Sequence, residues 1–261
     1  MQNKDKAKNQ SNKRELKRIL VTLPKPASGR SPYYDLAAKY NIELTFSPFI
    51  SVEGLTSKEF RQQNVNILDY SAVILVSRNA VDHFFRICEE IKIKIPQSMK
   101  YYCASQAVAL YLQKFITYRK RKVFYSEDGS SEQLLESLRK HKNKEKFIFP
   151  VSEHTKNDLS PVLKEEDFHF KEIPLYRTVN NNISEAMAKN PDLIVFFSPF
   201  SVDTLFDYDK DFEQGDMYIA AFGSNTCQAV RDKGLRLDIE APQPEIPSMS
   251  DAIIHYFENQ Q

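Results

Sequence analysis

Glycine is scarce in this sequence, with only 6 residues in 261. Such scarcity argues against glycine-rich loops that wrap a phosphate, and neither GxGxxG nor GxxxxGK[ST] occurs. The formal net charge is only +1, whereas nucleic-acid binders that rely on phosphate contacts carry a basic excess. The composition therefore favours neither a nucleotide-binding protein nor a nucleic-acid-binding one.

Cysteines and long apolar runs are also few. The three cysteines, Cys88, Cys103 and Cys227, are scattered and odd in number, which fits a reducing compartment better than a disulfide framework. No apolar run approaches the ~20 residues needed to span a bilayer. The segment Met1–Glu15 is polar and lysine-rich, lacks the apolar core of a secretory signal, and is predicted to be a disordered tail. We expect a cytoplasmic protein, monomeric and without a membrane partner.

The usual patterns of metal sites and serine hydrolases are missing. The histidines show no HxxxH or HxH spacing, and CxxC does not occur. Asp207–Asp211 begins like a calcium loop, but Phe212 stands where the loop needs glycine. No GxSxG motif surrounds Ser77 or Ser198. The basic run Arg119–Lys122 is open to two interpretations: a solvated surface, or a patch that attracts an acidic substrate.

Short apolar runs alternate with helical segments along the chain. Strands are predicted at 18–22, 42–52 (interrupted by Pro48), 72–76, 101–104, 122–125, 147–149, 170–178, 193–197 and 218–222. Helices are predicted at 32–40, 57–68, from 77 onward, and at 105–114, 131–140, 159–165, 201–206, 225–233 and 250–257. This alternation predicts an α/β fold with mostly parallel sheets and helices on both faces.

Two parts of the sequence resemble each other, and this internal similarity is called the echo below. Ala72–Phe85 aligns with Leu193–Phe206 at a constant offset, which matches Ser77 with Ser198, Val81 with Val202, Asp82 with Asp203 and Phe85 with Phe206. A second pair, Tyr102–Leu110 and Phe222–Val230, follows each copy. Serine and Val-Asp are not generic strand residues, so the echo predicts two similar α/β lobes.

Small hydroxyl and amide residues gather at the predicted strand-to-helix turns. They are Thr22, Ser77, Ser105, Ser198, Ser201, Ser224, Asn225 and Thr226. In open α/β sheets ligands bind beyond the carboxyl ends of the strands, where helix N-termini favour anions. These turns therefore suit a ligand with several carboxylates. The alternative is that each residue only caps its own helix.

Ordered motifs along the chain resemble those of the uroporphyrinogen-III synthase family. They are Thr22-Leu-Pro24, Ser77-Arg-Asn-Ala-Val81, Tyr102–Leu110, Leu175-Tyr-Arg-Thr178, Phe197-Ser-Pro-Phe-Ser201 and Phe222–Ala229. The resemblance implies two flavodoxin-like lobes of the HemD type, joined by two extended linkers. One lobe would combine 16–47 with 177–261, and the other would span 52–171. The linkers would cover about 46–52 and 171–178.

The resemblance also implies an activity. The family is a lyase that closes hydroxymethylbilane, a linear tetrapyrrole with eight carboxylates, to uroporphyrinogen III with inversion of ring D and loss of water. It needs no cofactor and acts by controlling conformation in the cleft between its lobes. Tyr176 would be the general acid. Besides the turn residues above, Lys25 and Asn79 would bind substrate.

Departures from the family pattern fall mostly in the first-half motifs and include Leu23, Cys103 and Gln106. They keep open a second interpretation, an inactive member that binds a tetrapyrrole or another anionic small molecule. Two further rivals fit less well. A two-lobed periplasmic receptor would need a signal segment, and a response-regulator module would need an acidic pocket after its first strand.

Overall fold

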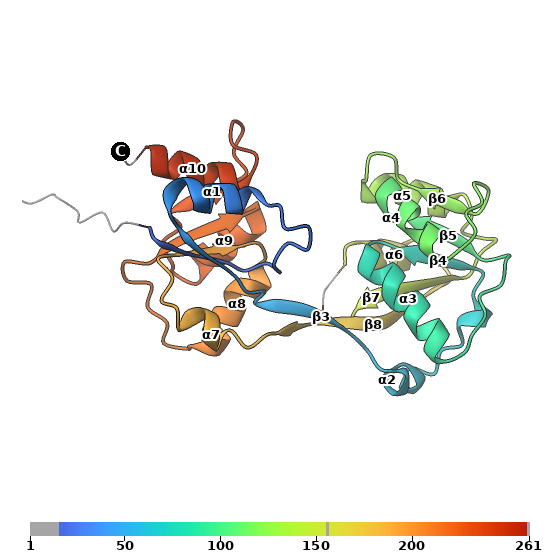
Figure 1. The fold of residues 1–261 in the computed structure, drawn as a ribbon. Coiled ribbons are helices and arrows are strands. Elements are labelled where there is room, and N and C mark those ends of the chain that lie inside the picture. Colours follow the sequence, from blue (N-terminus) through green and yellow to red (C-terminus); the bar gives the residue numbers. More distant parts are fainter. Residues whose placement is uncertain (1–15, 155–156, 260–261) are drawn as a thin grey trace, which may run out of the picture. The chain divides into compact units, whose positions relative to one another are not determined.

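The computed structural model describes residues 16–154 and 157–259 (Figure 1). The predicted disordered tail, Met1–Glu15, lies outside these described residues. The chain divides into two compact units. Unit 1 combines the residues up to Ser51 with those from Asn180 onward, and unit 2 is Val52–Val179. Within the described ranges, no helix is long and apolar enough to cross a membrane.

Unit 1 is built on a five-stranded sheet with the strand order β11-β10-β9-β1-β2. Its strands are β1 (Arg18–Val21), β2 (Glu43–Phe46), β9 (Leu193–Phe196), β10 (Tyr218–Phe222) and β11 (Ile239–Ala241). Its helices are α1 (Pro32–Tyr40), α7 (Ser184–Met187), α8 (Pro199–Tyr208), α9 (Ser224–Asp232) and α10 (Met249–Glu258). Every strand pair in this sheet is parallel. All the carboxyl ends therefore lie along one edge.

Alternating side chains of these strands fill two separate cores. On β1, Ile19 and Val21 belong to a core shared with α1 and α10, whereas Leu20 belongs to a core shared with α8 and α9. This two-residue period places helices on both faces of the sheet. Burial of each such large side chain contributes about 1.5–3 kcal/mol. The continuous apolar runs read from the sequence are the consequence of this two-sided cover.

Unit 2 holds most of a six-stranded sheet with the order β3-β8-β7-β4-β5-β6. Its strands are β3 (Ile50–Gly54), β4 (Ala72–Leu75), β5 (Lys100–Cys103), β6 (Val123–Tyr125), β7 (Phe147–Ser152) and β8 (Phe170–Asn180). Its helices are α2 (Ser57–Gln62), α3 (Arg78–Glu90), α4 (Gln106–Tyr111), α5 (Ser131–Arg139) and α6 (Leu159–Glu165), with the 3-10 turns η1 (Ile67–Asp69) and η2 (Leu112–Lys114). From β8 to β6 the pairs are parallel. The chain passes between the units in β3 and again in β8.

Two cores lie on opposite faces of the unit 2 sheet as well. On β4, Val73 and Leu75 pack in the core that contains α3 and α4 residues. Ala72 and Ile74 pack in the core that contains α5 and α6 residues. The predicted α/β class, with mostly parallel sheets covered on both faces, is confirmed.

The long helix predicted over residues 57–68 is wrong in its second half. Helix α2 ends at Gln62, and Asn64 takes a left-handed backbone with φ 52°. Asn66 then accepts a hydrogen bond from the Leu68 N–H and starts the 3-10 turn η1. Asparagine tolerates the left-handed region and competes with helical hydrogen bonds through its side chain, so it divides the segment.

Candidate functional site

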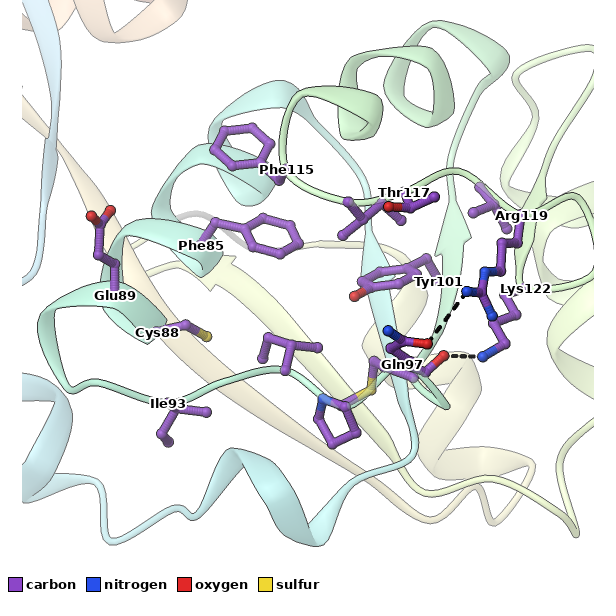
Figure 2. Close-up of a pocket in the computed structure, with 15 residues that line it drawn as sticks. Phe85, Cys88, Glu89, Ile93, Gln97, Tyr101, Phe115, Thr117, Arg119 and Lys122 are labelled. Carbon is purple, nitrogen blue, oxygen red and sulfur yellow. Dashed lines mark hydrogen bonds between the residues drawn. The ribbon is translucent and has the colours of Figure 1, made fainter.

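In each unit the carboxyl ends of the parallel strands lie along one side of the sheet, called here the carboxyl edge, and the amino ends lie along the other, the amino edge. A cavity of about 480 Å³ lies in unit 2 beside the amino ends of β5 and β6, and Arg119 and Lys122 of the basic run line it, but none of the predicted binding residues at the strand-to-helix turns does (Figure 2). The predicted residues of unit 2 lie at the opposite edge, beyond the carboxyl ends of β4 and β5. This edge is the candidate functional site of unit 2.

Two serines cap helices at that edge. The Ser77 hydroxyl accepts a hydrogen bond from the Ala80 N–H at 3.1 Å, and the Ser105 hydroxyl accepts one from the Val108 N–H at 3.4 Å. The capping alternative therefore applies to both residues. Capping uses a lone pair of the oxygen, so each hydroxyl keeps a proton that it can donate. Helix capping and ligand binding are compatible here.

Tyr176 lies on β8 opposite Ser152, the last residue of β7. Its ring stacks on His83 of α3, with centroids 5.2 Å apart, and the residue is only 9% exposed. Burial raises the pKa of Tyr176, while a hydrogen bond with Ser77 opposes the increase. The phenol is therefore protonated at neutral pH. The structure brings together the predicted acid and one predicted binding serine.

Arg86 holds His83 in place. Its Nε donates to His83 Nδ1 at 3.3 Å, and its Nη2 donates to the carbonyls of Leu55 and Leu175 at 2.6 and 3.5 Å. Burial and the charge of Arg86 lower the pKa of His83, so the ring is neutral and its proton lies on Nε2. A Cβ on Gly54 would stand within 2.7 Å of both side chains. Glycine leaves the space that this contact needs.

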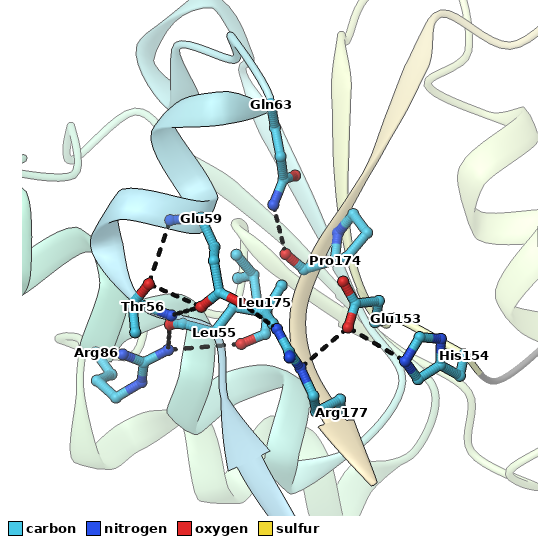
Figure 3. A network of polar contacts seen from close by, with 10 residues as sticks. All are labelled: Leu55, Thr56, Glu59, Gln63, Arg86, Glu153, His154, Pro174, Leu175 and Arg177. Atoms are coloured by element: carbon cyan, nitrogen blue, oxygen red, sulfur yellow. Dashed lines mark hydrogen bonds and ion pairs between the residues drawn. The ribbon is translucent and has the colours of Figure 1, made fainter. Parts of the chain in front are cut away.

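Arg177, next to Tyr176, is neutralised by two carboxylates (Figure 3). It forms an ion pair with Glu59 and another, at 3.0 Å, with Glu153. Glu59 also accepts hydrogen bonds from the N–H and the hydroxyl of Thr56. These two bonds, together with the contact to Arg177, lower the pKa of Glu59 to about 2. Because its charge is compensated, Arg177 serves mainly to hold β8 against α2.

An uncompensated cation lies on the same edge. Arg78, the first residue of α3, is exposed beside Ser77 and has no carboxylate within ion-pair distance in the described part of the chain. Its guanidinium lies 5.3 Å from the centre of the Tyr111 ring. The predicted residue Asn79 follows it and is also exposed. Arg78 is the side chain best placed here to meet a carboxylate.

The carboxyl edge of unit 1 repeats part of this pattern. The Ser198 hydroxyl caps α8 by accepting from the Phe200 N–H at 3.2 Å. Ser201 is buried one turn further on. Among the predicted residues of α9, Ser224 and Asn225 are exposed and Thr226 is buried. Helix α9 begins after Gly223 without a side-chain cap, so no capping side chain uses the N–H groups of its first turn and they are potential donors.

Thr22 and Lys25 follow β1 in the same unit. The Thr22 hydroxyl donates to the Val195 carbonyl at 2.9 Å, and the residue is 3% exposed. Its proton is therefore held in a hydrogen bond within the sheet. Lys25 is exposed in the loop before α1. Within residues 16–154 and 157–259, no group of three His, Cys, Asp or Glu side chains is placed to hold a metal ion.

Sequence reasoning missed His83, Arg86 and Arg78 as site residues. Both His83 and Arg78 lie inside the echoed segment, and Arg78 also stands at a strand-to-helix turn, so a sequence signal was present for them. No sequence signal pointed to Arg86, because its partners Leu55 and Leu175 are distant in the sequence and contribute only backbone carbonyls.

A family model described as Uroporphyrinogen-III synthase HemD matches residues 31–251. The chain belongs to this family. The predicted resemblance is therefore confirmed, over most of both units. Membership in the uroporphyrinogen-III synthase family connects the chain with the biosynthesis of tetrapyrroles, porphyrins and heme.

Solved structures of the family share the fold. The chain is similar to a uroporphyrinogen-III synthetase from Helicobacter pylori, with a TM-score of 0.59 and 14% identity over 94% of this chain and 100% of that one. It is also similar to a mutant uroporphyrinogen III synthase from Thermus thermophilus, with a TM-score of 0.56 and 15% identity over 93% and 98% of the two chains. No curated protein matches the sequence.

Proposed function

We propose that this chain converts hydroxymethylbilane to uroporphyrinogen III, with loss of water and inversion of ring D. Family membership supports the reaction class. The single observation that carries the assignment of chemistry is the cluster of Tyr176, Ser77 and His83 at the carboxyl edge of unit 2. It provides a protonated, positioned phenol on a sheet edge that also offers donors for carboxylates.

In the proposed reaction, the Tyr176 hydroxyl donates a proton to the departing hydroxyl group of the substrate, which leaves as water. The proton that ring D releases when the macrocycle closes reprotonates the Tyr176 phenolate. The resulting azafulvene is attacked by the substituted carbon of ring D, and rearrangement through a spiro intermediate inverts that ring. Burial of Tyr176 keeps the proton in place until it is needed. His83, fixed by Arg86, holds the phenol ring in one orientation by stacking.

The substrate carboxylates are assigned to donors at the carboxyl edges. In unit 2 these are Arg78, Asn79 and the hydroxyls of Ser77 and Ser105. In unit 1 they are Ser198, Ser224, Asn225 and the N–H groups of the first turn of α9, with Lys25 as a cation. The predicted roles of Thr22, Ser201 and Thr226 stay predictions, since all three are buried. Because many donors contribute to binding the carboxylates, most single substitutions should lower activity only modestly.

The test is to supply hydroxymethylbilane and to resolve the product isomers by chromatography. We expect the type III isomer, formed faster than the type I isomer that arises without enzyme. Formation of type I alone, at the uncatalysed rate, contradicts the proposal. Equilibrium binding without turnover would instead identify an inactive member, the alternative that the departures at Leu23, Cys103 and Gln106 raise.

A further inference from the structure

The cavity at the amino edge of unit 2 is a built pocket that the proposed reaction does not use. It lies between the second half of α3, the connection before β5 and the connection before β6. Phe85 and Phe115 form one wall, with rings stacked at 4.8 Å and 12°. Phe115 is 39% exposed although it is a large apolar side chain. A volume of about 480 Å³ falls within the range of small-molecule sites.

A tyrosine hydroxyl faces this cavity and has no partner among the described residues. Tyr101 of β5 is 4% exposed, and its ring lies 6.4 Å from that of Phe85. Its hydroxyl points into the space between Phe85 and Cys88 (Figure 2). Among the described residues none forms a hydrogen bond with it. Because no protein group uses this hydroxyl, it is available to donate a hydrogen bond to a ligand in the cavity.

Two cations lie at the other end of the cavity. Arg119 Nη2 donates to Gln97 Oε1 at 3.3 Å, and Lys122 Nζ donates to the Gln97 carbonyl (Figure 2). Neither cation has a carboxylate within ion-pair distance in the described ranges. Burial and the neighbouring cations Arg119 and Arg121 lower the pKa of Lys122. The positive charge at this end is therefore uncompensated.

The remaining polar lining residues do not change this picture. Glu89 of α3 lies at the end of the cavity away from Arg119 (Figure 2). Burial raises the pKa of the Cys88 thiol to about 12, so Cys88 is not a nucleophile at neutral pH. The pocket is suited to reversible binding and not to covalent chemistry.

We propose that this cavity binds a small aromatic carboxylate that carries an oxygen on its ring. The carboxylate lies between Arg119 and Lys122, the ring packs against Phe85 and Phe115, and the ring oxygen accepts a hydrogen bond from Tyr101. The site is separate from Ser77 and Tyr176, which lie at the opposite edge of the same sheet. Binding here is independent of the proposed reaction and is measured without turnover.

The probe is phloretate, a para-hydroxyphenyl propanoate, titrated into the full-length protein by isothermal calorimetry. We expect saturable binding at one site per chain. Hydrocinnamate, which lacks the ring oxygen, should bind about fivefold more weakly, because the Tyr101 hydroxyl is left unpaired. Tyramine, which replaces the carboxylate with an ammonium group, should not bind. Absence of saturable phloretate binding, or equal binding of tyramine, overturns the proposal.

Three variants locate the site. R119Q should weaken phloretate binding about tenfold, since a charge-assisted contact is lost. R121Q removes a neighbouring exposed cation that does not line the cavity and should leave binding unchanged. Y101F should abolish the preference for phloretate over hydrocinnamate, because no hydroxyl is then left unpaired by hydrocinnamate. Equal effects of R119Q and R121Q, or an unchanged preference in Y101F, contradict the assignment. Unchanged melting temperatures show that the variants are folded.

Discussion

The two echoed turns, Ser77–Asn79 in unit 2 and Ser198–Phe200 in unit 1, occupy matching places at the carboxyl edges of their sheets. Both serines cap the helix that follows. The next two positions differ in chemistry: unit 2 has Arg78 and Asn79, whereas unit 1 has Pro199 and a 41% exposed Phe200. The shared turn is required by the fold, and the surface it presents has diverged.

The same contrast extends along the helices. Val81 and Val202 are both fully buried. Asp82 accepts from the Tyr111 hydroxyl at 2.8 Å, whereas Asp203 forms an ion pair with Lys233 at 2.8 Å. Each aspartate thus links its helix to the next one by different means. The two units share the architecture of this turn and helix, and they differ in the polar side chains placed on it.

Substitution of Tyr176 is the strongest test of whether the catalytic chemistry belongs to unit 2. If the chemistry belongs to unit 2, Tyr176→Phe should lower kcat about 100-fold, the lower range for loss of a general acid. Ser198→Ala, at the matching edge of unit 1, should lower it less than about fivefold, because backbone donors remain. Steady-state kinetics on hydroxymethylbilane compare the two. An unchanged kcat in Tyr176→Phe removes the acid assignment.

Matched core substitutions test whether the echo is a structural repeat. Val81→Ala and Val202→Ala each remove two buried methyl groups and should each cost about 2 kcal/mol of unfolding free energy. Differential scanning calorimetry is the suitable method, since the chain has no tryptophan for fluorescence. A large cost for only one valine would show that the aligned positions are not equivalent.

Substitution of Arg78 tests whether the positive charge at the unit 2 turn binds a substrate carboxylate. Arg78→Gln should raise KM for hydroxymethylbilane about tenfold with little change in kcat, since a carboxylate contact is lost from ground and transition state alike. The effect should weaken at high salt because the side chain is exposed. Arg61→Gln, which changes an exposed arginine on α2, is the control. A fall in kcat at constant KM would assign Arg78 a role in the chemical step.

Glu59 provides the smallest expected effect, because its side chain is 37% exposed and its ion pair is screened by solvent. Its pKa in the folded protein, about 2, lies below the ordinary glutamate value of 4.5, so its stabilising contribution is complete above pH 4.5 and disappears as pH falls toward 2. Glu59→Gln should therefore be less stable than the parent protein at pH 6 and equal to it near pH 2. Urea unfolding across this range measures the difference. A constant difference at all pH values would exclude the ionised carboxylate as its source.

Sequence patterns predicted the elements whose signals are local. Ser31 before Pro32 indicated the start of α1, and the structure places the cap and the helix there. Strand β11 was not predicted, because three residues ahead of Pro242 and Pro244 give no periodicity, and only pairing with β10 makes them a strand. The same applies to α7, a single turn.

The site was predictable where it follows from topology and not where it depends on tertiary contacts. Ser77 and Ser105 could be placed because parallel strands bring their turns to one edge. The stacking of His83 on Tyr176 joins two residues that are far apart in the sequence, and Arg86 reaches carbonyls that no motif encodes. Side-chain contacts of this kind are decided by packing, which a single sequence does not display.

The position of β1 inside unit 1 has a consequence for synthesis of the protein. Thr22, at the end of β1, bonds to Val195 of β9, 173 residues later, so this sheet cannot close until most of the chain has been translated. Unit 2 is one uninterrupted stretch and can leave the ribosome whole before β9 is made. Until then β1 and β2 have only each other to pair with. During this interval the unpaired edge of β1 is open to pairing with other chains, and a chaperone that covers it would prevent this.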